Sequence, residues 1–429
     1  MKLLNNKFVG NVSWVLIGNF AHAVFQFLIN ILAARTLSEH DYGLINYAIS
    51  IVALFTSIGT LGFNGIITKN FAEDEASAGK YIWSAVICRL IISVPLIVGI
   101  YIIGYLHAPN DETLHKILLC QGLTVLYSSG DIFVYWFRYR YRANLVAILR
   151  LITFAIMAIW RILALVVFKS LLGYVIGTTT ESLLFVVFLA TVYLKKSQPK
   201  LIFDISVAKG MLRISYPFIF SALLATVYGQ TDKIMLESMI STESVAVYSV
   251  SLTLAGAISI IPTALIEGFR PEIMRSKEID ENTYEKRMRQ VYFIVFWLCI
   301  VYCVFVSAFA KPIILLLYGE KYIGAVSSLS LIVWYTSFSY FGGINNIFMV
   351  AENQAKWVQI TTLVGAVTNI VLNIILIPHL GIVGAGLASL ITQIVANFLL
   401  LYIIKPLRKC FYLQINGILN RDCFNFKHV

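Results

Sequence analysis

An acidic and a basic residue stand side by side in a mostly apolar stretch, YGQTDKIMLE at 228–237. Consecutive residues of a helix point about 100° apart, so Asp232 and Lys233 would not neutralise each other. If the stretch spans a membrane, each charge costs about 2.5 to 3.5 kcal/mol and avoids lipid. We expect Lys233 to face a water-filled cavity. Asp232 would meet a partner on an adjacent helix, either in an ion pair or as an ion-coupling group.

Two segments about 200 residues apart carry polar residues at helical spacing. The first stripe contains His22, Gln26 and Asn30, and the second contains Thr226, Gln230, Lys233 and Glu237. A shift of 204 residues lays Gln26 on Gln230, which indicates equivalent helices in two halves of the chain. Such stripes line a polar cavity or hold helices together.

Further charges lie inside apolar segments. Arg150, Thr153 and Arg161 share one helical face, and Tyr174, Thr178 and Glu181 share another. Later segments are neutral but polar along one side, and they include Asn369, Asn373 and Ser389. Amide and hydroxyl groups suit sugar hydroxyls, and they suit helix packing equally well.

These residues divide into two predicted roles. For binding the anionic head and glycan of a substrate we predict Lys233, Arg161, Arg150, Arg89, Gln26, Asn30 and Gln230. For ion coupling we predict His22, Glu181 and Asp232. In the competing hypothesis Arg161 pairs with Glu181, and Lys233 pairs with Glu237, in a purely structural network.

The composition places these helices in a bilayer, because 59% of the 429 residues are hydrophobic and 13% are charged. Apolar runs of about 20 residues recur along the chain and predict twelve transmembrane helices. Their ranges are 8–34, 43–65, 81–106, 117–136, 146–168, 171–194, 214–238, 245–268, 290–310, 326–350, 358–377 and 384–404.

The basic residues set the orientation. By our count 24 of the 33 Lys and Arg residues fall in loops on the side of the N-terminus and 5 on the other side. Both termini are therefore predicted to be cytoplasmic. The same bias explains the net charge of +11 as a topology signal, so nucleic acid is not an expected partner.

The loops leave no room for a folded catalytic domain, and no GxxxxGK[ST] sequence is present, so the prediction is a transporter and not an enzyme. The six cysteines form no disulfide framework, and Cys299 and Cys303 lack a third ligand nearby. No metal or cofactor is predicted.

A basic, Pro-containing connection divides the twelve helices into two sets of six. The predicted parts are a first lobe at 1–194, the connection at 195–210, a second lobe at 211–404 and a cytoplasmic tail at 405–429. Bending is expected near Pro95, Pro217 and Pro262.

Three motifs carry a family resemblance: ARTLSEHDYGLINYA at 34–48, DKIML at 232–236 and NIVLNIILIPHLGIVGAGLAS at 369–389. With them the chain resembles the polysaccharide flippases, the O-antigen and capsule branch of the multidrug/oligosaccharidyl-lipid/polysaccharide exporter superfamily. The resemblance implies two six-helix lobes around a central cavity. It also implies transport of an undecaprenyl-diphosphate-linked glycan across the bacterial plasma (inner) membrane by alternating access.

The partners that this resemblance implies are the lipid-linked glycan and membrane lipids, with a glycan polymerase and chain-length proteins as further candidates. A cation-coupled small-molecule exporter of the drug-efflux branch is the alternative, although its cavity should favour acids over bases. A membrane-embedded glycan polymerase or transferase is the third hypothesis, which the short loops disfavour.

Overall fold

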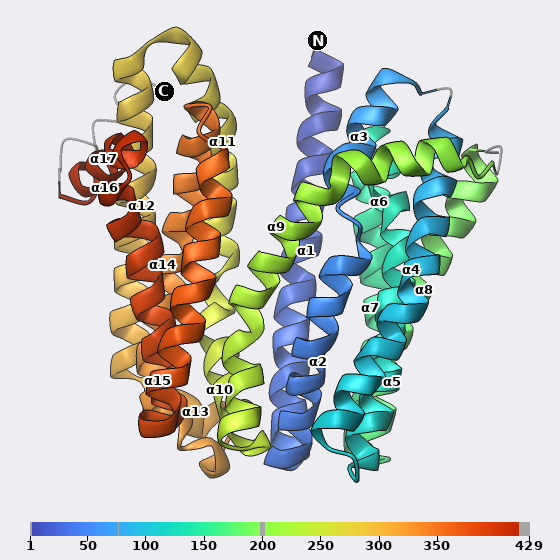
Figure 1. Ribbon diagram of the computed structural model, residues 1–429, viewed down its shortest axis with the longest axis vertical. Helices are drawn as coiled ribbons and strands as arrows, with labels where there is room; N and C mark the ends of the chain where they lie inside the picture. Colours follow the sequence, from blue (N-terminus) through green and yellow to red (C-terminus); the bar gives the residue numbers. More distant parts are fainter. Residues whose placement is uncertain (1, 76, 198–201, 420–429) are drawn as a thin grey trace. The chain divides into compact units, whose positions relative to one another are not determined.

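The computed structural model describes residues 2–75, 77–197 and 202–419, and within these ranges it is helical with no strand (Figure 1). The chain divides into two compact units, which we call unit 1 (Met1–Gln230) and unit 2 (Thr231–Val429). Each of the twelve predicted spans lies largely on helical residues, and the spans at 43–65, 117–136, 245–268 and 384–404 each cross from one helix to the next. The predicted all-α polytopic class is therefore confirmed.

Unit 1 begins with a long helix and contains two interrupted ones. Its helices are α1 (Lys2–Thr36), α2 (Glu39–Gly59), α3 (Asn64–Glu73), α4 (Ala78–His107), α5 (Glu112–Tyr127), the 3₁₀ turn η1 (Ser128–Asp131), α6 (Ile132–Tyr139), α7 (Ala143–Val166), α8 (Leu171–Ser197) and most of α9 (Ile205–Met239). Ser38 begins α2, because its hydroxyl accepts a hydrogen bond from the Asp41 backbone amide at 3.0 Å.

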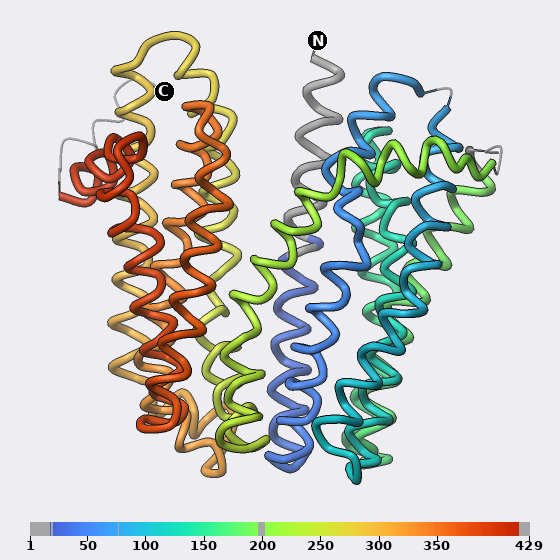
Figure 2. The backbone as a smooth tube through the Cα atoms, in the orientation of Figure 1, coloured from blue at the N-terminus to red at the C-terminus, as the bar shows by residue number. Residues whose placement is uncertain are grey.

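The break between α2 and α3 depends on a glycine (Figure 2). Gly62 has φ +61°, a conformation that costs other residues free energy. A Cβ at this position would also lie 2.8 Å from the Ser215 carbonyl oxygen and 2.9 Å from Phe218 Cβ. The start of α9 thus packs directly on the break.

An aromatic core fills unit 1 on the side of α3 and α6. Its buried residues include Phe63, Phe71, Phe133, Trp136 and Met211. Met211 belongs to α9, which explains why the compact unit extends to residue 230. The sequence predicts the second lobe from residue 211, whereas the first compact unit extends to Gln230. The predicted lobe boundaries stay a prediction.

Unit 2 is built from the remaining helices. They are α10 (Thr242–Ala255), the 3₁₀ turn η2 (Gly256–Ile258), α11 (Ile260–Ile279), α12 (Glu281–Ala308), α13 (Ala310–Leu317), the turn η3 (Glu320–Tyr322), α14 (Ala325–Ala351), α15 (Lys356–Ile394), a π-helical turn η4 (Val395–Leu399), α16 (Leu400–Ile403), the turn η5 (Lys405–Leu407) and α17 (Arg408–Leu419). Its core includes Tyr284, Tyr292, Phe341, Leu407 and Leu413.

The predicted bend sites lie within or beside helices. Pro95 and Pro217 are inside α4 and α9. Pro262 stands in the first turn of α11, directly after a 45° bend between the α10–η2 segment and α11. A proline in the first turn leaves no hydrogen bond unmade, so Pro262 suits the start of the redirected helix.

A second glycine divides α15 into the two spans that the sequence predicts. Gly381 has φ +57° and ψ −133° inside the helix, after Pro378. A Cβ at Gly384 would lie 2.4 Å from the Leu376 carbonyl oxygen, so the chain can reverse here only with glycine. The motif at 369–389 is therefore a tight hairpin of two helices.

Eight helices of the described residues are long and apolar enough to cross a membrane, or nine if the bent pair around η2 counts as one span. This number is below twelve partly because α15 contains two predicted spans. In addition, the apolar helix Phe20–Thr36 within α1 is too short to count as a span. Large apolar side chains such as Leu106 and Val301 are 74% and 68% exposed, as expected of surfaces that face lipid.

Candidate functional site

Arg161 is the centre of a polar network inside unit 1. This residue of α7 is 1% exposed, and its Nη2 donates to Glu181 Oε2 on α8 at 2.8 Å. Nη1 donates to Gln26 Oε1 on α1 at 3.1 Å, and the guanidinium lies 5.0 Å from the centre of the Phe154 ring. The predicted pairing of Arg161 with Glu181 is confirmed.

The polar stripe of α1 extends this network in both directions. His22 Nε2 lies 3.7 Å from Glu181 Oε1, and its ring packs on Phe154 at 4.6 Å between centres. Gln26 Nε2 donates to Asn30 Oδ1 at 3.0 Å. The structure therefore joins three predicted binding residues and both predicted coupling groups of unit 1 in one cluster of α1, α7 and α8.

Arg89 is separate from this cluster and is completely buried on α4. Nη2 donates to Asn64 Oδ1 at 2.7 Å, and Nη1 donates to the Ser128 carbonyl at 3.4 Å. Asn64 begins α3 and Ser128 begins η1, so one guanidinium joins the breaks of two helices. The predicted substrate contact of Arg89 stays a prediction.

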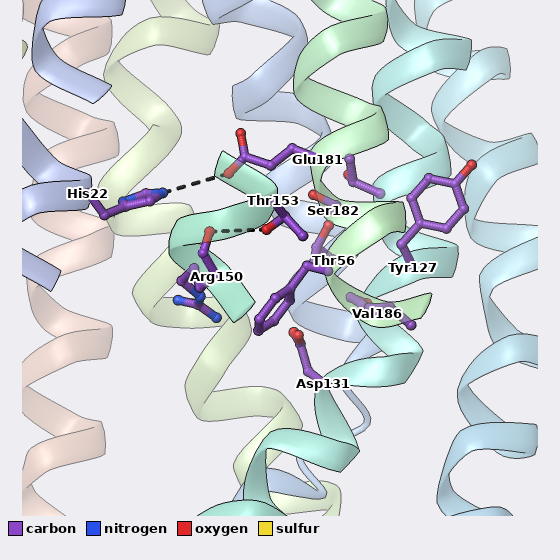
Figure 3. A pocket seen from close by; sticks show the side chains of 12 residues that line it. His22, Thr56, Tyr127, Asp131, Arg150, Thr153, Glu181, Ser182 and Val186 are labelled. Atoms are coloured by element: carbon purple, nitrogen blue, oxygen red, sulfur yellow. Dashed lines mark hydrogen bonds and ion pairs between the residues drawn. The ribbon is translucent and has the colours of Figure 1, made fainter. Parts of the chain in front are cut away.

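Arg150 lies at a polar pocket of about 350 Å³ in unit 1 (Figure 3). Its guanidinium stands 4.7 Å from the centre of the Phe185 ring and forms no ion pair with a described residue. Asp131 also lines the pocket, and sequence reasoning missed it. The signal was available, because Asp131 is an acidic residue inside a predicted span at 117–136.

Asp232 is the centre of a second network, in unit 2. Its carboxylate on α9 is 6% exposed and accepts hydrogen bonds from Asn373 Nδ2 at 2.7 Å, Asn369 Nδ2 at 3.1 Å and Ser389 Oγ at 2.5 Å. The Tyr248 hydroxyl on α10 also donates to it. Asp232 thus meets adjacent helices as predicted, but its partners are neutral donors and not a cation.

This network leaves one acceptor unused. Asn373 Oδ1 is buried and has no hydrogen-bond partner among the described residues. Asn369 Oδ1 accepts from Asn373 Nδ2 at 3.1 Å. A buried carboxylate without a cationic partner, next to an unpaired amide oxygen, can hold a proton or a small monovalent cation. No group of three or more His, Cys, Asp or Glu side chains in the described ranges is placed to hold a metal ion.

Lys233 follows directly on α9 and does not pair with Glu237. Glu237 Oε1 instead accepts from the Thr242 hydroxyl at 2.9 Å. Lys233 is half-buried, and no ion pair or hydrogen bond holds its amine among the residues that the structure describes. One turn earlier, Gln230 Oε1 is buried without a hydrogen-bond partner. The predicted convergence of Lys233 with Arg161 joins different units and stays a prediction.

Comparison with known proteins places these features in a family context. The family model described as polysaccharide biosynthesis protein matches residues 8–268, and the MatE model matches residues 217–375. The capsular polysaccharide biosynthesis protein CapF of Staphylococcus aureus is 21% identical over 413 residues, which are 92% of this chain and 99% of that protein. The probable flippase AglR of Haloferax volcanii is 25% identical over 175 residues, 40% of this chain and 37% of its own.

Solved structures share the fold. The lipid II flippase MurJ in an inward closed conformation superposes with a TM-score of 0.75 at 17% identity, covering 94% of this chain and 90% of its own. An inward-facing multidrug resistance MATE transporter of the MOP superfamily superposes with a TM-score of 0.71 at 16% identity, covering 90% and 96%.

Proposed function

Because the chain belongs to the polysaccharide biosynthesis protein family, among the polysaccharide flippases of the MOP superfamily, we propose that it flips an undecaprenyl-diphosphate-linked oligosaccharide. The glycan, an O-antigen or capsule repeat unit, would pass from the cytoplasmic to the outer leaflet of a bacterial plasma membrane by alternating access. Both termini would be cytoplasmic. The protein would act as a transporter and not as an enzyme.

The observation that supports an anionic substrate most directly is the unpaired amine of Lys233. A half-buried ammonium without a carboxylate partner is costly in an apolar span unless water or an anion solvates it. An anionic diphosphate would supply the missing partner of this amine. This arrangement favours an anionic lipid over the cationic drugs of the alternative exporter function.

The network of Asp232 supports ion coupling as part of the same proposal. Its carboxylate is held by four neutral donors and has no ion-pair partner in the described part of unit 2. Binding or release of a proton or monovalent cation would change the net charge that α9, α10 and α15 share. His22 and Glu181 remain the corresponding proposal in unit 1, where Arg161 already balances the carboxylate.

The test is flipping of a fluorescent undecaprenyl-diphosphate-linked disaccharide in proteoliposomes. Lys233→Gln should reduce the initial rate to near that of empty vesicles, because the only free cation of the stripe is lost. Lys69→Gln is the matched control, since Lys69 is an exposed lysine paired with Glu73 on α3. If the well-folded Lys233→Gln variant flips the lipid at the parental rate, the proposed contact between Lys233 and the diphosphate is refuted. Drug transport without lipid flipping would favour the small-molecule exporter.

A further inference from the structure

We infer that the pocket of unit 1 is a sugar subsite that takes a hydroxyl-bearing ring of the glycan, separate from any contact with the diphosphate. This inference rests on the proposed function and names the part of the substrate that the pocket receives. The volume of about 350 Å³ lies at the lower end of ligand sites, roughly 300 to 1,000 Å³. The pocket therefore fits a part of a repeat unit and not the whole glycan.

The pocket wall is rich in hydrogen-bond acceptors. The hydroxyls of Thr56, Thr124, Ser128 and Thr153 each donate to a backbone carbonyl three or four residues earlier, at 2.5 to 3.1 Å. Because each hydroxyl has one proton, these groups keep only oxygen lone pairs for a ligand. A ligand that donates hydrogen bonds is the complement of such a wall.

The side chains of Asp131 and Arg150 both line this pocket (Figure 3). Neither the Asp131 carboxylate nor the Arg150 guanidinium forms a hydrogen bond or ion pair with a described residue, and the guanidinium covers the Phe185 ring. They do not pair with each other. An ionised carboxylate accepts up to about four hydrogen bonds, so Asp131 can bind two neighbouring hydroxyls. Arg150 can donate to the ring or glycosidic oxygen of the same sugar.

The charge of the pocket argues against a phosphate in this place. A phosphate only accepts hydrogen bonds, and here it would face the carboxylates of Asp131 and Glu181 with Arg150 as the one cation not already paired. Sugar hydroxyls are neutral donors and acceptors, so they meet no such repulsion. Phe185 and Val186 add apolar surface for the carbon face of a ring.

Binding of simple sugars to the purified full-length protein in nanodiscs tests the subsite. The probes are methyl glucoside, glucosamine and inorganic phosphate, and saturation-transfer NMR reports binding and competition. We expect methyl glucoside to bind weakly and phosphate not to displace it. Asp131→Asn should weaken binding about tenfold, because it replaces an acceptor-only group by an amide.

Thr56→Val gives an independent check, since it removes one acceptor while it preserves the shape of the side chain. The control is Thr191→Val on α8, whose exposed hydroxyl makes the same kind of backbone bond at 2.7 Å outside the pocket. Thermal unfolding of each variant verifies folding. Three results would each overturn the proposal that the pocket binds sugar hydroxyls. They are unchanged binding of methyl glucoside in both folded pocket variants, displacement of methyl glucoside by phosphate, and binding of glucosamine alone.

The binding measurement needs neither a lipid carrier nor an ion gradient, so it separates the subsite from the proposed function. Flipping by the parental protein without binding of methyl glucoside would refute the subsite alone. Binding that depends on Asp131, in a protein that flips no lipid-linked glycan, would refute the flippase function and leave a sugar site.

Discussion

Removal of either partner of the Arg161–Glu181 pair should destabilise the protein strongly. The Arg161 side chain is 2% exposed and the Glu181 side chain 18%, and 2.8 Å separates Nη2 from Oε2. Arg161→Leu would leave Glu181 with His22 alone, at 3.7 Å. Breaking a buried pair in this way costs about 3–5 kcal/mol of unfolding free energy. Glu181→Gln should have a similar effect, because it leaves the guanidinium with neutral partners.

The double variant should recover much of this loss. When both charges are absent, no buried ion remains unpaired, so a double-mutant cycle should give a coupling free energy of about 2–3 kcal/mol. Equilibrium unfolding in mixed micelles with increasing sodium dodecyl sulfate, followed by tryptophan fluorescence, measures the four free energies. Lys116→Gln serves as the exposed control, because its pair with Glu112 lies at the surface, and no measurable change is expected.

Additive effects of the two substitutions would refute the reasoning. So would Arg161→Leu with an unfolding free energy within about 1 kcal/mol of the parent, because a structural ion pair could not then be the main contact of this side chain. In that case Arg161 would be available to a ligand, and the binding role predicted from the sequence would regain support.

Three further outcomes follow from the geometry. Asp232→Asn should make flipping in proteoliposomes insensitive to an imposed proton or sodium gradient, and a retained gradient dependence would remove Asp232 from coupling. Gly381→Ala should cost about 1–3 kcal/mol, because its φ of +57° with ψ −133° is strained for alanine, whereas Gly210→Ala in an open part of α9 should leave the melting temperature unchanged or raise it. Hydrogen bonds from the backbone and hydroxyl of Thr283 hold the pKa of Asp280 below its usual range. The stability from this helix cap is therefore complete above the unfolded pKa and is lost as the pH falls through the folded pKa, so Asp280→Ala should lower the melting temperature at pH 7 and have little effect near pH 2.

The sequence predicted the helices well because each span is a continuous apolar run. It also placed His22, Gln26 and Asn30 on one face, and this face does meet a neighbouring helix. Helical periodicity gives the direction of a side chain around its own axis. It cannot give the partner, and for that reason both pairing hypotheses stayed open until the structure showed Arg161 with Glu181 and no pair at Lys233.

The remaining site residues escaped prediction for a different reason. Asp131 in η1 and Arg150 in α7 belong to different spans, so helical spacing could not connect them. Tyr248 has an ordinary aromatic sequence context, and only the packing of α10 on α9 brings its hydroxyl to Asp232. Hydropathy reports the environment of a whole segment, whereas hydrogen bonds between segments depend on depth and rotation.

The two helix breaks that Arg89 joins cannot move independently. Asn64 and Ser128 begin the segments after the breaks of α2 and α5, and one rigid guanidinium plane binds both. Beyond the breaks, Phe71 of α3 packs edge-on against Trp136 of α6 at 5.3 Å. Arg89 at the breaks and the aromatic contact beyond them therefore link α3 to α6. A movement of unit 1 at these two breaks would displace α3 and α6 together.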